Sequence, residues 1–382
     1  MYIFFGDIWQ VQYMLGILAT LYPYLVLLYL IDCLIYVGRQ QVYFISHSGK
    51  RFRMVKSGIH LSGLFPFSQS FAAGKPDLYP SENGIYIRSD DTENRGFIND
   101  LEAFRFVPYG AFDIPSSQDK NVVLNKTTVV KTPSPLFAKR LAERLAGIAK
   151  TEHNKRCELI GQFMEEDTDI ERIKEIHGSF NRQFGALKIL CTALFTAFFI
   201  LLPIALYWLP SPKLILTALL VHMGILYVCT VSYAYYLLGK VYGKNSGLKT
   251  KVMLSLTLSP VAAVHALGYL TKDLFTLFDP AALAAFLLPI EQFKDHMRRE
   301  IYRIHSACSE NDDFGWAEFW QMRLASMRGV LNRLDLKEAD LTAQPEKTED
   351  SADRYCPVCR TEYRSGFRFC SDCRVLLTAY AE

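Results

Sequence analysis

Long uninterrupted runs of apolar residues constrain this chain more than any other feature. Four such runs cover residues 11–37, 186–209, 214–238 and 252–270, and a weaker one covers 274–290. A bilayer core about 30 Å thick needs roughly 20 consecutive apolar residues per helix, which a soluble core does not need. The pattern therefore predicts a polytopic α-helical membrane protein, with the lipid bilayer as a partner.

The weaker run, 274–290, has an internal helix start. Asp279 followed by Pro280 is a favourable N-cap and first-position pair, so a short helix should begin midway. The segment is a fifth span, a re-entrant segment or an interfacial helix. A basic stretch follows and belongs inside, which requires an even number of crossings after the third run and favours five spans. The residues of that stretch are Lys294, Arg298, Arg299 and Arg303.

Basic residues also predict which side of the membrane the loops occupy. The first run is followed by five of them, and the loop after the third run contains lysines and no acid, so the positive-inside rule places both in the cytoplasm. The N-terminus is then outside and the C-terminus inside. The first ten residues lack the positive start of a cleavable signal peptide, so the first run should be retained. The two basic sets are Arg39, Lys50, Arg51, Arg53 and Lys56, and Lys240, Lys244, Lys249 and Lys251.

Residues 39–150 change to short β-rich runs broken by turn residues. Asn125-Lys126 offers a tight hairpin turn, and residues 136–149 form an amphipathic helix with Leu141, Leu145 and Ile148 on one face. We expect a cytoplasmic β-barrel or roll closed by this helix. The expected strands are Val42–Ile45, Gly84–Arg88, Phe104–Val107, Asn121–Leu124 and Thr127–Val130.

Composition predicts the structure of the remaining segments. Residues 291–336 should be amphipathic cytoplasmic helices whose aromatic face docks on the membrane, on a partner helix or on the β-rich domain. The stretch 337–353 is polar and acidic without aromatics, which is typical of a flexible linker. The full order is an N-terminal transmembrane helix at 1–38, the β-rich domain at 39–150, charged juxtamembrane helices at 151–185, transmembrane hairpins at 186–290, the amphipathic helices, the acidic linker, and a small metal-binding module at 354–382.

The strongest chemical motif is CPVCRTEYRSGFRFCSDC near the C-terminus, two C-x2-C pairs ten residues apart. Each pair places two sulfurs on one side of a turn, and two such turns complete a tetrahedral shell, so the spacing predicts one structural Zn²⁺. Iron in a rubredoxin-like site is the alternative. The ligands would be Cys356, Cys359, Cys370 and Cys373.

The nine cysteines also bear on the compartment. An odd number, with several in apolar runs, suits reduced thiols plus a metal site rather than a disulfide framework. The module should therefore face a reducing cytosol.

The cysteine pattern resembles the small zinc ribbons found at the ends of many bacterial proteins, whose knuckles commonly read CPxCG and CxxCG. Arg360 and Arg374 replace the two glycines here. Because those positions often have positive φ, we expect backbone strain at both arginines. The stretch FRFVPYGAFDIP with NVVLNKTTVV resembles bacterial pleckstrin-homology-like domains that are tethered to membranes. Together the resemblances imply a bacterial inner membrane protein with a cytoplasmic ribbon.

Catalytic motifs are lacking: the chain has no P-loop, no G-x-S-x-G and no HExxH. We therefore expect a non-enzymatic scaffold or sensor that uses the β-rich domain and the ribbon to contact another protein. A net charge of +3 argues against nucleic acid as a general partner, although the arginine-rich ribbon leaves contact with nucleic acid or anionic lipid open. The alternative is a small-solute or ion transporter using the 186–290 helices. Its path would involve His222 or His265, each of which more often is a hydrogen-bonded interior residue.

Overall fold

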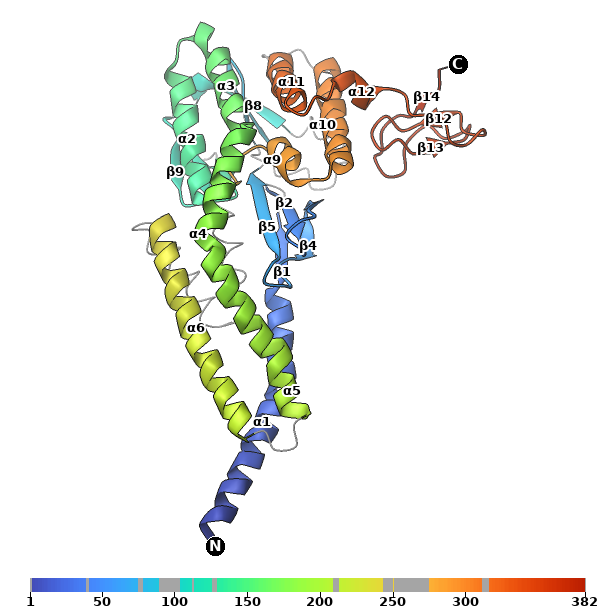
Figure 1. Ribbon diagram of the computed structural model, residues 1–382. Helices are drawn as coiled ribbons and strands as arrows, with labels where there is room; N and C mark the ends of the chain where they lie inside the picture. Colours follow the sequence, from blue (N-terminus) through green and yellow to red (C-terminus); the bar gives the residue numbers. More distant parts are fainter. Residues whose placement is uncertain are drawn as a thin grey trace. The chain divides into compact units, whose positions relative to one another are not determined.

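The computed structural model contains two compact units, which are described separately (Figure 1). Unit 1 consists of Met1–Gly38, Tyr43–Ala72 and Glu175–Leu274, and unit 2 of Arg39–Val42, Ala73–Lys174 and Phe275–Glu382. The structure describes residues 2–38, 41–74, 78–88, 104–111, 113–125, 129–208, 213–242, 250, 275–310 and 316–381.

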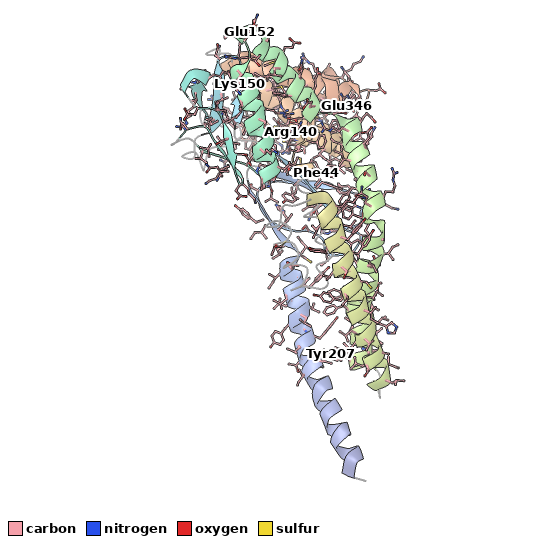
Figure 2. The ribbon with its side chains drawn as sticks, turned by 90° about the vertical axis from the view of Figure 1, so that its left-hand side faces the viewer. Phe44, Arg140, Lys150, Glu152, Tyr207 and Glu346 are labelled. Carbon is pink, nitrogen blue, oxygen red and sulfur yellow. The ribbon has the colours of Figure 1, made fainter. Side chains whose placement is uncertain are left out.

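Long helices dominate unit 1. A π-helical turn at Ala197–Leu201 interrupts one of them just before Pro203, which cannot donate to the carbonyl four residues earlier. Tyr207, which is labelled in Figure 2, donates from its hydroxyl to the Ala19 carbonyl at 2.8 Å and so ties two helices together. The helices are α1 (Tyr2–Asp32), α4 (Ile170–Thr196), α5 (Leu202–Tyr207) and α6 (Lys213–Tyr242).

Within the residues that the structure describes, two continuous helical stretches are long and apolar enough to cross a membrane. They cover His153–Tyr207 and Leu214–Lys240, and so include all but the last two residues of the predicted run 186–209 and the whole of the run 214–238. Only 11% of the apolar window of α6 is buried within the protein, and Leu214 is 84% exposed. A helix that is apolar on all sides suits an apolar surrounding. The run 252–270 lies outside the described residues.

Aromatic residues hold the helices of unit 1 together. The Tyr29 ring of α1 lies 4.9 Å from Phe199 and 6.3 Å from Phe195.

His222 is exposed on α6, and its Nδ1 lies 2.7 Å from the carbonyl of Ala218 in the same helix. The expectation of an interior histidine is wrong here, and His265 is outside the described residues. His222 therefore lends no support to a transport path.

The strands form small separate sheets instead of the expected barrel or roll. Among the described strands none closes a barrel, because those of residues 34–131 are only three to six residues long and pair in groups of two or three. Unit 1 holds β1 (Leu34–Val37) paired with β4 (Gly58–Leu61), and most of the sheet β3 (Arg53–Val55), β2 (Gln41–Ser46) and β5 (Gln69–Gly74). Unit 2 holds β6 (Leu78–Pro80), β7 (Gly84–Arg88) and β8 (Phe104–Pro108), and also β9 (Ser116–Gln118), β10 (Asn121–Val123) and β11 (Val129–Lys131).

The expected helix after the strands is present as α2 (Pro135–Lys150), followed by α3 (His153–Asp167). Ser134 caps α2 by accepting from the Phe137 N–H at 3.2 Å. Leu145 and Ile148 are buried and Leu141 packs beside them, so the predicted apolar face is confirmed. The antiparallel pairing of β10 with β11 is also as predicted, but Val123 pairs with Val129, so the connection is longer than the expected two-residue turn at Asn125-Lys126, part of which lies outside the described residues.

The weaker apolar run contains the short helix α9 (Pro280–Leu287). Asp279 is its N-cap and accepts from the Ala281 N–H at 2.8 Å, as the sequence predicts. Eight helical residues span about 12 Å, far less than the roughly 30 Å of a bilayer core. Four consecutive residues from Ala281 to Ala284 are buried in unit 2. The expectation of a fifth span at 274–290 is therefore wrong.

The amphipathic region is observed as α10 (Ile290–Glu310) and α11 (Trp316–Asn332), followed by α12 (Glu338–Thr342). Phe319 and Trp320 of α11 are buried and lie 5.0 and 5.5 Å from the Tyr79 ring of β6. The aromatic face thus packs on a β-sheet of unit 2. Of the alternatives open at the sequence level, packing against the β-rich region is the one observed.

Ion pairs with little solvent exposure join the helices of unit 2. Arg323 of α11 contacts Asp279 at 2.5 Å, with the two side chains 15% and 10% exposed. Arg144 of α2 contacts Asp167 at 2.7 Å, and the Asp167 carbonyl accepts the Asp279 N–H at 2.8 Å. Burial raises the pKa of Asp167, opposed by the guanidinium of Arg144. The network links α2, α3, α9 and α11.

We predict that Arg323→Leu lowers the free energy of unfolding by about 3–5 kcal/mol, because it leaves the Asp279 carboxylate buried without its partner. Pulse proteolysis of the full chain in detergent would measure this. Lys139→Ala is the control, because Lys139 and Glu143 form a pair whose side chains are 68% and 67% exposed. It should cost about 0–1 kcal/mol. Equal losses in the two variants would contradict the structural role of the network.

Candidate metal centre

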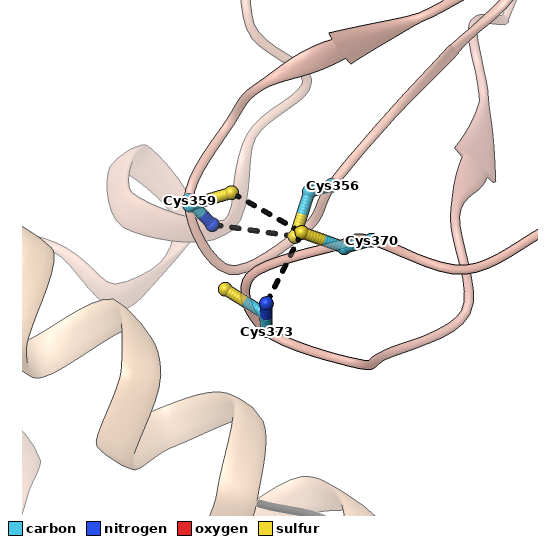
Figure 3. A group of neighbouring side chains, drawn as sticks. All are labelled: Cys356, Cys359, Cys370 and Cys373. Carbon is cyan, nitrogen blue, oxygen red and sulfur yellow. Dashed lines mark hydrogen bonds between the residues drawn. The ribbon is translucent and has the colours of Figure 1, made fainter.

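Four cysteine side chains converge in the C-terminal module (Figure 3). The module is a three-stranded sheet of β13 (Glu362–Tyr363), β12 (Arg354–Tyr355) and β14 (Thr378–Ala379), in that order. All four sulfurs lie within 4.8 Å of one another, with Cys359 Sγ 3.6 Å from Cys370 Sγ. A regular tetrahedron with 2.3 Å metal–sulfur bonds has edges of about 3.8 Å. The four sulfurs can therefore hold one metal ion. They are Cys356, Cys359, Cys370 and Cys373.

The two C-x2-C turns have the same backbone hydrogen bonds. In the first, the Cys356 N–H donates to the Thr361 carbonyl, the Arg360 N–H donates to the Cys356 carbonyl, and the Cys359 N–H donates to Cys356 Sγ. The second repeats this pattern with Cys370, Val375, Arg374 and Cys373. Backbone N–H groups that point at sulfur favour the thiolate, the form that binds a metal.

Both knuckle arginines have positive φ, 63° at Arg360 and 56° at Arg374. The strained backbone predicted at these two positions is thus confirmed. A left-handed conformation costs a residue with a Cβ roughly 1–2 kcal/mol.

Arg360 also makes contacts that the sequence did not predict. Its Nη2 donates to the carbonyls of Asp340, Leu341 and Ala343 at 3.3, 3.1 and 3.5 Å, where α12 ends and helix carbonyls lack partners. The Leu341 carbonyl also accepts from Arg298 Nε of α10 at 3.0 Å. The ribbon is thereby attached to α12, which Arg298 in turn joins to α10. Arginine at a knuckle position where zinc ribbons commonly have glycine was the only sequence feature that pointed to this contact.

The stretch expected to be a flexible linker is held against the ribbon. The Glu362 carboxylate accepts the N–H groups of Thr348 and Glu349 at 2.7 and 2.9 Å and the Tyr380 hydroxyl at 3.0 Å. These bonds, that of Thr348 first, lower the pKa of Glu362 to about 2. Acidic composition alone did not reveal the contact, because polar ribbon groups rather than apolar burial hold this backbone.

The thiols ionise unequally. Burial works against ionisation of Cys370, but the Tyr363 hydroxyl donates to its sulfur at 3.3 Å and, with backbone N–H groups, lowers its pKa to about 6. Burial raises the pKa of Cys356 to about 11. Bringing the buried sulfurs to the thiolate form together thus requires a compensating cation.

The donor set defines what the centre can do. Four protein sulfurs complete a tetrahedral shell and leave no position for water or substrate, which is typical of a structural site rather than a catalytic one. Val358 and Val375 are buried beside the cysteines, and Tyr302 of α10 packs against the same cluster. The apolar core around the metal ligands is small.

Comparison with protein-family models, curated proteins and solved structures finds no match to this chain. The resemblances to bacterial zinc ribbons and to pleckstrin-homology-like domains therefore stay predictions. What can be said of the site comes from its geometry.

We predict that the purified full chain carries one metal ion and that Cys370→Ser removes it. Metal binding is worth roughly 10–16 kcal/mol in isolated zinc peptides, so the ribbon of this variant should unfold and become open to proteases. Elemental analysis and limited proteolysis would measure the two effects. Cys157→Ser removes a thiol outside the centre and should leave both unchanged. Full metal content in Cys370→Ser would contradict the assignment.

The two arginines with positive φ provide a matched test of the attachment to α12. Arg374→Gly should stabilise the ribbon by up to about 1 kcal/mol, because glycine relieves the strain at an exposed position. Arg360→Gly relieves similar strain but loses the bonds to the end of α12, so amide hydrogen exchange around 341–349 should accelerate on the order of tenfold. Equal exchange in the two variants would exclude the role assigned to Arg360.

Proposed function

We propose that this chain is an integral membrane protein, a non-enzymatic scaffold whose zinc ribbon presents a cytoplasmic docking face to a partner protein. The observation that carries the proposal is an exposed apolar patch on a metal-centred module that is itself fixed to unit 2. The metal, the membrane topology and the docking face are supported separately.

Zinc is the metal we assign to the four cysteines. A closed shell of four thiolates at tetrahedral spacing suits structural Zn²⁺, which has no geometric preference of its own and no redox chemistry. Iron bound by the same sulfurs is the alternative. The two are distinguished by the colour of the purified protein and by elemental analysis, since tetrahedral Zn²⁺ has no visible absorption.

Three crossings give the topology that fits both units. Unit 2 combines residues 73–174 with residues 275–382, so a bilayer cannot separate these segments. One crossing by α4 with α5 and another by α6 return the chain to the side it left; this count covers the described residues, and the predicted run 252–270 lies outside them. With α1 as the first crossing and the basic loops inside, the N-terminus is outside and unit 2 is cytoplasmic. A bacterial inner membrane is the location we propose.

The docking face consists of Phe367, Phe369 and Leu376, which are 57%, 58% and 59% exposed. Phe369 and Leu376 form an antiparallel bridge, so their side chains lie on the same face of the hairpin. Large exposed apolar side chains concentrated on so small a module are typical of a protein-binding surface. Arg364 and Arg368 are exposed in the same hairpin, so the partner should be an acidic segment with apolar anchors.

The experiment places a photo-crosslinking residue at Phe367 in the full chain in its native membrane. We predict one defined protein adduct, which is lost when Phe369→Ser and Leu376→Ser are combined, because the apolar anchor sites are gone. Metal content must be unchanged in that variant. Ile114→Ser, which removes a side chain that is 70% exposed elsewhere in unit 2, is the control and should keep the adduct. An undiminished adduct in the double variant would refute the docking face.

A further inference from the structure

One short loop of unit 1 lies near the C-terminal end of α1 and beside the apolar part of α4. We call residues Ser62–Ser68 the FPF loop, after the sequence Phe65-Pro66-Phe67 at its centre. The Tyr29 hydroxyl of α1 donates to the Leu64 carbonyl at 2.9 Å. The Phe65 ring lies 6.3 Å from the ring of Phe195 in α4. The loop thus contacts two of the three helices that we assign to the membrane.

The depth of this contact follows from α4 itself. Lys188 is the only charged residue of the run 186–209 and lies at its start, and its ammonium donates to Asn181 Oδ1 at 2.7 Å, so the side chain extends back toward the cytoplasmic end of the helix. Lysines near the end of a spanning helix adopt this direction to keep the charge at headgroup level. Phe195 lies two helical turns further on, roughly 10 Å deeper. The FPF loop therefore reaches below the level of the headgroups.

Non-helical backbone tolerates such a position only when its polar groups have partners. The Phe65 N–H donates to Ser68 Oγ at 3.0 Å, and the Ser68 N–H donates to the Phe65 carbonyl at 2.9 Å. The Ser62 N–H donates to the Cys33 carbonyl at 2.8 Å, and Pro66 has no N–H. Much of the loop's hydrogen bonding is thus internal or directed at α1.

The tip of the loop is apolar and exposed. Phe65 and Phe67 stack with their ring centroids 5.2 Å apart and their planes 9° from parallel, and they are 37% and 53% exposed. A stacked aromatic pair held outward at the end of a loop is costly in water and favourable among acyl chains near the bilayer surface.

A basic turn lies directly beside the tip. Gly49 has φ 72°, and a Cβ at this position would meet the Phe67 carbonyl at 2.8 Å, so only glycine allows the turn to approach so closely. Lys50 and Arg51 follow Gly49 and are exposed. The Ser68 hydroxyl also donates to the His47 carbonyl at 3.3 Å, which holds the turn against the loop. Positive charge and an aromatic wedge therefore occur side by side.

We infer that the FPF loop inserts into the cytoplasmic leaflet and that Lys50 and Arg51 bind the phosphates of anionic lipids around it. The inference rests on the proposed membrane assignment of α1, α4 and α6. The occupant is the bilayer because the loop adjoins helices of membrane length and its charged flank complements lipid phosphate. The wedge would fix the depth of α1 and α4 in the leaflet.

The test uses the full chain reconstituted in vesicles of phosphatidylcholine with phosphatidylglycerol, doped with lipids brominated along the acyl chain. Phe67→Trp should give a fluorescence increment that the bromines quench. Val129→Trp is the control, because Val129 in unit 2 has an exposure of 50%, which matches that of Phe67, and its increment should not be quenched. An unquenched Phe67→Trp increment overturns the insertion.

A second comparison tests the lipid charge. Quenching of Phe67→Trp should decrease when phosphatidylglycerol is omitted, and this dependence should be lost when Lys50→Ala and Arg51→Ala are added. If quenching is the same with and without phosphatidylglycerol in both proteins, the phosphate contact is refuted.

Extraction at alkaline pH separates this inference from the proposed function. A chain that stays in the membrane with an unquenched tryptophan refutes the loop alone, whereas a chain that is extracted refutes the membrane assignment.

Discussion

The carboxylate of Asp279 stands at the point where the chain enters the C-terminal part of unit 2. One oxygen caps α9 and the other pairs with Arg323, while the backbone N–H of the same residue binds the Asp167 carbonyl. The contact between Asp279 and Asp167 joins segments more than a hundred residues apart. Buried ion pairs add little net stability over an apolar core, but they are costly to break and favour one arrangement over others. The assembly of α2, α3, α9 and α11 depends on this arrangement.

Side-chain contacts with other segments also hold the C-terminal ribbon in place. Its apolar core is small and surrounds the four cysteines, and its surface is attached to α12 through Arg360 and to the preceding polar stretch through Glu362. Strain at Arg360 is thus compensated by hydrogen bonds that a glycine could not make. Because Tyr302 of α10 packs against the cysteine cluster, folding of the metal site and packing of the helices share contacts. A module attached in this way presents its exposed phenylalanines in a defined orientation within unit 2.

Several features were predictable because they depend on neighbours in the sequence. The cysteine spacing predicted the convergence of four sulfurs, the cap at Asp279 predicted a short helix, and the periodicity of Leu145 and Ile148 predicted the buried face of α2. The knuckle positions of Arg360 and Arg374 predicted positive φ. The predictions of a barrel, a fifth span and a flexible linker were wrong. Which strands pair, how long a helix is within an apolar run and which polar groups hold a stretch of backbone all depend on residues far away in the sequence.

By itself, the sequence determined the local chemistry of this protein: where apolar helices run, where charge accumulates and which four sulfurs can share one ion. These properties require only the order of side chains along a few turns of backbone. The tertiary structure alone decided that Arg360 caps α12, that Asp279 meets Arg323, and that the Phe65–Phe67 pair lies against α1 and α4. Such contacts depend on where separate segments come together, because directed hydrogen bonds and close packing are set in three dimensions and leave no periodic trace in the chain.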